Sequence, residues 1–168
     1  MPNRYIVPDL LAPNLRLVFC GTAPSRASAA ARAYYAKPGN RFWPTLHRVG
    51  LTPCRFQPHA YADLLNLRIG LTDLCKAHCG NDDELPVGAF DVAAFRRKIK
   101  RYQPLYVAFT SKNAAQTYFL RKTNYGIQPE TLGVTQFFVL PSPSGLATRF
   151  WNEGVWRELA ELITSIQQ

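Results

Sequence analysis

The chain has 168 residues, of which 47% are hydrophobic and 18% charged. This composition excludes an intrinsically disordered protein, and the length suits one domain, which we expect to span residues 1–168. Twenty Lys and Arg against eleven Asp and Glu give a formal net charge of +9, which favours an anionic partner such as nucleic acid.

No apolar run approaches the ~20 residues needed to cross a bilayer, and the N-terminal sequence MPNRYIVPDLLAPN lacks the features of a signal peptide. We therefore expect a cytoplasmic protein of the bacterial cytosol or nucleoid, monomeric and without a membrane partner. The cysteines Cys20, Cys54, Cys75 and Cys79 show no paired CxxC spacing. No metal site, disulfide framework or organic cofactor is expected.

Strands and helices alternate along the chain. The apolar run Leu15–Cys20 predicts a strand that ends at Gly21, where the segment GTAPSRASAA turns into Ala-rich helical sequence. A second helix is expected over Arg41–Val49, with Asn40 as its N-cap. This first part of the chain therefore predicts a strand, a turn and two helices.

The rest of the chain continues the alternation. The predicted elements are a helix over Ala60–Leu67, a strand over Ile69–Leu74, a helix from its N-cap Asp91 to Tyr102, a strand over Leu105–Phe109, a helix over Lys112–Leu120, a strand over Gln136–Leu140 and a helix over Val155–Ile166. The last helix is amphipathic, with Val155, Leu159, Leu162 and Ile166 on one side. The order predicts a three-layer α/β/α sandwich around a mostly parallel sheet, with ligands bound beyond the carboxyl ends of the strands.

Three segments at strand ends carry candidate functional residues. The first is the turn Gly21–Ser25 (GTAPS), which lacks the Lys of a P-loop and the glycine spacing of a dinucleotide fingerprint. Its backbone N–H groups at a helix start suit a carbonyl oxygen or a developing anion. A purely structural turn is the alternative interpretation.

The second segment is YYAKPGNRFW, which sets four aromatic residues around a Pro-Gly turn. Asn40 within it offers both an amide donor and a carbonyl acceptor. The segment suits the stacking of a nucleobase, although Phe42 and Trp43 are expected in the core.

The third segment is PSPSGLATRFWN, from Pro141 to Asn152. It combines stiff prolines, small hydroxyl residues, the apolar Leu146 and the cation Arg149. Such a loop can bind DNA phosphates and insert an apolar side chain, a wedge, between stacked bases. A surface loop with one stray leucine is the alternative.

Taken together, VFCGTAPS, AKPGNRFW and VLPSPSGL resemble, in this order and spacing, the mismatch-specific uracil and thymine DNA glycosylases of the uracil-DNA glycosylase superfamily. The resemblance covers most of the chain, from LAPNLRLVFCG through GLTD and KRYQPLYVAFTSK to the final loop. It implies a base excision repair enzyme that flips a damaged base out of DNA and hydrolyses its bond to the sugar. Uracil is the first choice of base, and hypoxanthine, xanthine and mismatched thymine stay open.

The chain departs from the family in its first motif. The family usually has GINPG, whose Asn holds the attacking water, whereas the matching position is Ala23 and Ser25 replaces the closing glycine. Asp73 of GLTD is the first candidate to orient the water instead. It lies at the end of a predicted strand, and with the reference pKa of ~3.9 its carboxyl would be ionised at neutral pH. Asn40 is the rival, since the relatives that act on hypoxanthine also lack the first-motif Asn and resemble enzymes that use the Asn of the PxNxFW segment instead. A capping or turn-forming role is the alternative for Asp73.

The resemblance implies roles for further residues. Tyr35 matches the aromatic residue that stacks on the base. The turn and pocket residues implied to bind the base are Gly21, Thr22, Ala23, Pro24, Ser25 and Ser28. The loop residues implied to bind DNA are Ser142, Pro143, Ser144, Gly145 and Arg149, with Leu146 as the wedge.

Two other classes of function compete with this one. A Ser hydrolase is disfavoured, because GxSxG is missing and no motif places His47, His59 or His78. A catalytically inactive module that binds DNA lesions stays open, because Ala23 removes the usual catalytic amide. The motifs place no Lys as a Schiff-base nucleophile, so a monofunctional enzyme that leaves an abasic site is expected, with Lys112 as the possible exception.

Overall fold

The computed structural model describes residues 5–166, so residues 1–4 and 167–168 of the predicted domain lie outside the described part. One five-stranded sheet has the order β2-β1-β3-β5-β4. Its strands are β1 (Leu17–Gly21), β2 (Ile69–Asp73), β3 (Tyr106–Phe109), β4 (Gly126–Leu132) and β5 (Thr135–Val139). Only the pairing of β4 with β5 is antiparallel within the described sheet. The expected mostly parallel sheet is confirmed.

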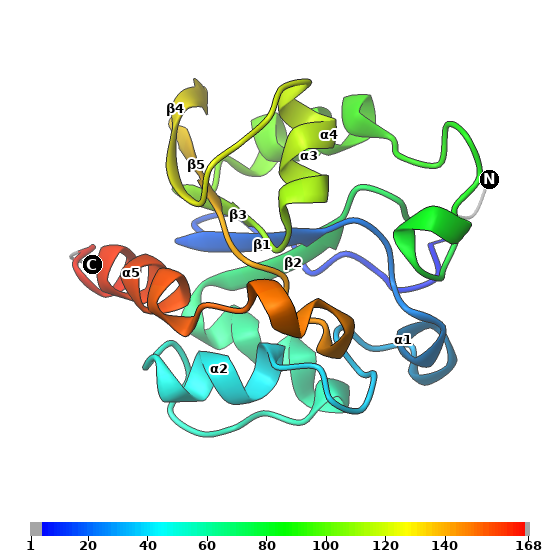
Figure 1. The fold of residues 1–168 in the computed structure, drawn as a ribbon. Helices are drawn as coiled ribbons and strands as arrows, with labels where there is room; N and C mark the ends of the chain where they lie inside the picture. Colours follow the sequence, from blue (N-terminus) through cyan, green and yellow to red (C-terminus); the bar gives the residue numbers. More distant parts are fainter. Residues whose placement is uncertain (1–4, 167–168) are drawn as a thin grey trace.

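Helices cover both faces of this sheet (Figure 1). One face carries α3 (Val92–Tyr102) and α4 (Lys112–Phe119), and the other carries α2 (Phe42–Arg48), α5 (Glu153–Thr164) and the 3-10 helix η1 (Pro58–Leu67). The remaining helices are α1 (Arg26–Ala31) and the 3-10 helices η2 (Asp82–Glu84) and η3 (Gly145–Phe150). The three-layer α/β/α sandwich is therefore confirmed. Within residues 5–166, no helix has the length and apolar character to cross a membrane.

Two hydrophobic cores lie on the two faces of the sheet. On the side of α2 and α5, Phe19 stacks on Trp156 at 5.8 Å between ring centroids and meets the edge of Phe42 at 5.0 Å. On the side of α3 and α4, Phe109 stacks on Phe137 at 5.7 Å. Alternate residues of a strand point to opposite faces, so a strand buried on both faces is a continuous apolar run. This is why the sequence of β1 was recognisable.

The N-terminal segment covers the edge of the sheet at β2. Leu10 and Leu71 exchange two backbone hydrogen bonds of 2.9 Å. Gly70 permits this approach, because a Cβ there would lie 2.5 Å from the carbonyl oxygen of Leu10. The edge next to Asp73 is thus closed by the chain itself.

The structure differs from the prediction at one strand and at one helix boundary. β4 was not predicted, because its sequence GIQPETL has no continuous apolar run and contains Pro129, which an edge strand tolerates. α2 begins at Phe42, so Arg41 rather than Asn40 flanks it. The Oδ1 atom of Asn40 nevertheless accepts a 2.9 Å hydrogen bond from the backbone N–H of Phe42.

The buried side of α5 also differs from the expected one. Its buried residues are Trp156, Leu159, Ala160 and Ile163. Three of the predicted residues, Val155, Leu162 and Ile166, are only partly buried at the margin of the core. The reason is Trp156, whose large ring occupies the core while its indole N–H donates to the carbonyl of Pro141 at 3.0 Å.

Candidate active site

The parallel strands end at one edge of the sheet, and a pocket of about 600 Å³ opens there. β1 ends at Gly21 and β2 at Asp73, while β3 leads into Thr110 and β5 into the loop of Ser142. All four of these residues line the pocket. The topology thus brings together segments that are far apart in the sequence.

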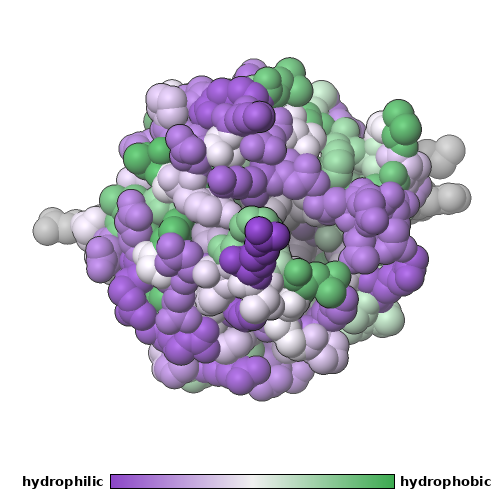
Figure 2. Space-filling view, in the orientation of Figure 1, coloured by the Kyte–Doolittle hydropathy of each residue, from purple (hydrophilic) through white to green (hydrophobic). Residues whose placement is uncertain are grey.

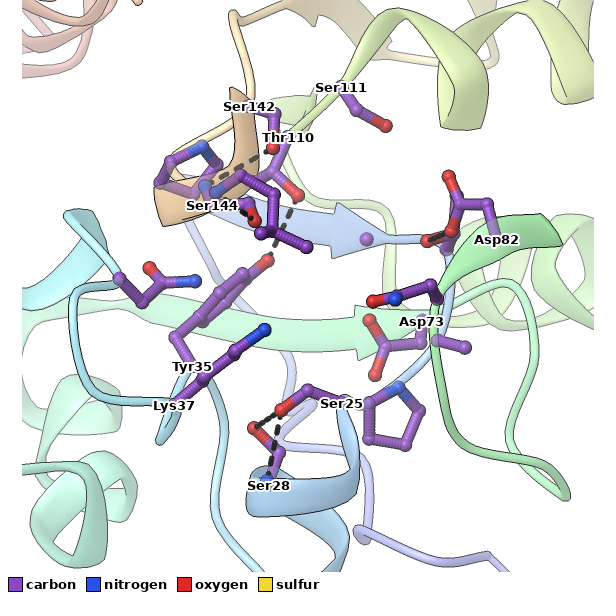
Figure 3. Close-up of a pocket in the computed structure, with 18 of the residues that line it drawn as sticks. Ser25, Ser28, Tyr35, Lys37, Asp73, Asp82, Thr110, Ser111, Ser142 and Ser144 are labelled. Atoms are coloured by element: carbon purple, nitrogen blue, oxygen red, sulfur yellow. Dashed lines mark hydrogen bonds between the residues drawn. The ribbon is translucent and has the colours of Figure 1, made fainter. Parts of the chain in front are cut away.

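Most residues predicted for the site line this pocket (Figure 3). They are Gly21, Thr22, Ala23, Pro24, Ser25, Ser28, Tyr35, Asn40, Asp73, Ser142, Pro143, Ser144 and Leu146. Gly145 and Arg149 are the two predicted residues that do not line it. Gly145 packs against the backbone of Gly39, and the exposed Arg149 lies over the ring of Phe150 at 5.8 Å.

Asp73 is the buried acidic residue of the pocket. Its exposed fraction is 5%, and its Oδ2 atom is buried without a hydrogen-bond partner among the described residues. Burial raises the pKa of this carboxyl to about 7, although the charge of Lys76 acts in the opposite direction. Asp73 was expected to be ionised at neutral pH from the pKa of a solvated carboxyl; with a pKa of about 7, it is ionised only in part at that pH.

Gly21 makes room for the carboxylate of Asp73. A Cβ at Gly21 would lie 2.7 Å from Oδ1 of Asp73, and 3.4 Å from the hydroxyl oxygens of Thr110 and Tyr35. Any side chain at this position would displace the carboxylate. The first residue of the GTAPS motif is therefore needed for its lack of a side chain.

A largely buried network of charges, centred on Asp9, connects β2 with its neighbours. Asp9 accepts from Lys76 at 3.0 Å and from Lys98 of α3 at 2.7 Å. The hydroxyl of Thr72, next to Asp73 in sequence, donates to Asp9 at 2.7 Å. Lys76 also donates to the hydroxyl of Tyr34 at 2.9 Å. The network thus ties the residues beside Asp73 to the residue before Tyr35.

Tyr35 forms one wall of the pocket. Its ring stacks on Phe42 at 3.9 Å between centroids with an angle of 17°, and its hydroxyl lies 3.1 Å from that of Thr110. Its φ of 52° is left-handed, a conformation that costs free energy for a bulky residue. Phe42 and Trp43 lie in the core as expected, with exposed fractions of 0% and 3%. The ring of Tyr35 is thus fixed in place by the packing around it.

Two serines join the GTAPS turn to the loop of Tyr35. Ser25 caps α1 by accepting from the backbone N–H of Ser28 at 3.0 Å. The buried Ser28 hydroxyl receives the Ser25 hydroxyl at 3.1 Å and the backbone N–H of Ala36 at 3.0 Å. Ser28 therefore lies where it holds two pocket segments together.

Arg41 joins the loop of Asn40 to the final loop. Its backbone N–H donates to the carbonyl of Pro143 at 2.8 Å. Its guanidinium donates to the carbonyl of Ser144 at 3.2 Å and to the hydroxyl of Thr148 at 3.0 Å. Arg41 was not among the site residues predicted from the sequence.

The final loop presents its apolar residues to solvent. Leu146 in η3 has an exposed fraction of 70% and Phe150 one of 62%, although both are large hydrophobic side chains. The face that carries η3 is otherwise mostly hydrophilic, with hydrophobic side chains in small separate groups (Figure 2). An exposed leucine at the mouth of a pocket has no packing role in the fold, so it is available for a partner.

The pocket also contains residues that the sequence analysis missed. They are Tyr34, Lys37, Gly80, Asn81, Asp82, Asp83, Thr110, Ser111 and Ala147. Asp82 is held by the hydroxyl of Thr22 and the amide of Asn113, each at 2.6 Å. The only sequence signal for this wall was the acidic run NDDE. Lys112, named as a possible nucleophile, does not line the pocket, and its amine lies over the ring of Tyr125 at 4.4 Å.

The comparisons with known proteins agree with this fold. A family model described as the uracil DNA glycosylase superfamily matches residues 8–160, so the chain belongs to that superfamily. Membership supports a DNA glycosylase with DNA as its substrate. Among solved structures, the chain is similar to the solution NMR structure of a candidate uracil DNA glycosylase from Methanosarcina acetivorans. The TM-score is 0.66 and the identity 23%, over 94% of this chain and 96% of the other, which shows a shared fold.

Proposed function

We propose that the protein is a monofunctional DNA glycosylase that flips a deaminated base, with uracil as the first choice, and hydrolyses its bond to the sugar. The observation that carries the proposal is the buried, unpartnered Oδ2 of Asp73 in a pocket walled by Tyr35. An orphaned carboxylate oxygen is costly unless a substrate or water uses it. The product would be an abasic site in DNA.

Binding and base flipping follow from charge and shape. The net charge of +9 attracts the phosphate backbone, and Leu146 enters the base stack where the nucleotide leaves. Extruding a nucleotide costs a few kcal/mol, least for a weakly paired base. Stacking on Tyr35 returns roughly 1 to 3 kcal/mol. Deaminated bases in mismatches are therefore the favoured substrates.

The chemical step separates charge across the bond between C1′ and the base. As that bond breaks, its electron pair leaves with the base and the sugar becomes an oxocarbenium-like cation. In its ionised form, Asp73 stabilises this cation and accepts the proton of the water that attacks C1′. Residues of the GTAPS turn line the same pocket, and their backbone N–H groups would donate hydrogen bonds to the departing base.

Asp73 suits this role better than its rival Asn40. The Oδ1 atom of Asn40 already accepts the backbone N–H of Phe42 at 2.9 Å, whereas Oδ2 of Asp73 has no partner among residues 5–166. Orienting a water for attack requires an acceptor that is available. Asn40 can still offer its amide N–H groups to a base.

The test is a panel of duplexes that carry uracil, hypoxanthine, xanthine or mismatched thymine. We expect native protein to release uracil fastest, Asp73→Asn to lose about 10²–10³-fold in rate and Asn40→Ala to lose less. Unchanged activity in Asp73→Asn would overturn the assignment of Asp73.

Two further outcomes separate the remaining alternatives. Retarded DNA on a gel without release of any base would identify an inactive lesion-binding module. Strand breaks that appear without alkali or heat would contradict the monofunctional mechanism.

A further inference from the structure

Lys37 is the only lysine or arginine among the described residues that line the pocket. Its loop is fixed on both sides, because Ala36 donates to Ser28 at 3.0 Å and the carbonyl of Lys37 accepts from Asn40 at 3.0 Å. Figure 3 shows the side chain extending into the pocket, with its amine on the side of Tyr35 that faces Asp73 and Ser25. The ion pairs within residues 5–166 do not include it. Its charge is therefore available to a ligand.

The other charged groups of the pocket are carboxylates. Asp73 lies on the floor, and Asp82 and Asp83 lie on the wall. In the proposed reaction the sugar gains positive charge and the base gains negative charge. Carboxylates favour the first change and oppose the second. A donor directed at the base would remove this opposition.

Among the described pocket residues no other side chain is a cationic donor, although Asn40 offers neutral amide N–H groups. The position that matches the family's Asn is Ala23, whose side chain has no polar atom. The hydroxyl of Thr22 donates to Asp82, and the hydroxyl of Ser25 donates to Ser28. A base stacked on Tyr35 would lie beside the side chain of Lys37, which begins two residues further along the same loop.

We propose that Lys37 is a catalytic residue that stabilises the negative charge developing on the departing base. The inference rests on the proposed function and names the group that assists the leaving base. Heterolysis of the C1′–N bond places the electron pair on the base, and the ammonium of Lys37 donates a hydrogen bond to that anion. No proton has to be transferred during bond cleavage.

The test compares two leaving groups of different quality. Fluorine stabilises the anion of 5-fluorouracil, so this base needs less assistance than uracil does. Rates are measured in single turnovers, which report the cleavage step rather than product release. The proteins are native, Lys37→Met, Lys37→Arg and Lys122→Met, the last of which loses the same charge at an exposed residue outside the pocket lining.

We expect Lys37→Met to slow the release of uracil about 10²-fold and that of 5-fluorouracil about 10-fold or less. Lys37→Arg should recover part of the uracil rate because it keeps a cationic donor. Lys122→Met should change both rates equally and slightly.

Three results would overturn the inference. Equal losses on both bases in Lys37→Met would make Lys37 a phosphate-binding or structural residue and leave the proposed function standing. A borohydride-trapped adduct that requires Lys37 would make it a nucleophile attacking the sugar. Release of neither base by native protein would refute the proposed uracil activity and this role together.

Discussion

The ionised form of Asp73 serves the proposed reaction but destabilises the folded protein. Its carboxyl has a pKa of about 7 because it is buried, and its Oδ2 atom has no partner among residues 5–166. The charged groups that act on it are Lys76 after β2, Lys98 of α3 and Asp9 of the N-terminal segment. The two lysines lower its pKa and Asp9 raises it, but burial has the largest effect. The ionised form is therefore the form that the fold disfavours.

This conflict gives Asp73→Asn a pH-dependent effect on stability. The folded pKa of about 7 exceeds the ordinary value of 3.8, so the folded protein keeps a proton that the unfolded chain loses between these pH values. The free energy of unfolding falls as the pH rises through this window, by up to about 4 kcal/mol. Asp73→Asn removes the penalty, so it should be more stable than the native protein at pH 8 and nearly equal at pH 4.

Thermal unfolding followed by circular dichroism at both pH values tests this prediction. A gain of about 2 to 4 kcal/mol should raise Tm by roughly 5 to 15 °C at pH 8. An equal change in Tm at pH 4 and pH 8 would show that ionisation of Asp73 is not the cause.

At the scale of elements, the buried charges fasten the N-terminal segment to β2 and α3. Asp9 is paired with both Lys76 and Lys98, so the three residues carry a net positive charge. Removing the charge of Asp9 leaves the buried Lys76 and the partly buried Lys98 without their carboxylate, whereas removing Lys76 leaves Asp9 paired with Lys98. We therefore expect Asp9→Asn to cost about 3 to 5 kcal/mol and Lys76→Met about 1 to 3 kcal/mol.

Urea denaturation of the two variants measures both costs. The expected order depends on Asp9 being shared between the two lysines. A larger loss in Lys76→Met than in Asp9→Asn would contradict this account of the network.

Leu146 in the η3 helix is predicted to enter the DNA base stack. Leu146 lines the pocket and is 70% exposed, so Leu146→Ala should leave the stability of the protein unchanged. It should slow base release from duplex DNA by about 10-fold or more, and from single-stranded DNA far less, because only the duplex has a paired stack to invade. Phe150→Ala is the matched control on the same helix, since Phe150 is 62% exposed but does not line the pocket. Equal losses on both kinds of DNA would refute the wedge role.

Some elements of the fold and some residues of the site could be predicted from the sequence, and others could not. The buried strands were predictable from their apolar runs, and parallel strands end at a common edge, so the meeting of Gly21, Asp73 and Ser142 could be anticipated. Lys37 and the Asp82 wall were missed, because loop residues follow no periodic pattern. The pKa of Asp73 could not be predicted either, because it depends on burial by distant segments.

At the scale of the whole molecule, the net charge of +9 governs the encounter with DNA. Each phosphate neutralised by a cation releases counterions, so log K should fall linearly with log salt, with a slope of about −3 to −6 for roughly four to six neutralised phosphates. Undamaged and uracil-containing duplexes should give similar slopes, because the base itself carries no charge. Titrations by fluorescence anisotropy at four salt concentrations measure both slopes, and affinity that is independent of salt would exclude a phosphate-driven encounter.

The loop of Asn40 and the final loop pack tightly against each other. A Cβ at Gly145 would lie 3.3 Å from the carbonyl oxygen of Gly39, and Arg41 spans the junction to Pro143 and Thr148. An insertion in either stretch would break this junction unless the opposite stretch changed as well. In related proteins, the lengths of these two loops should therefore change only together. Tyr35 and Leu146 should then be retained or lost as a pair.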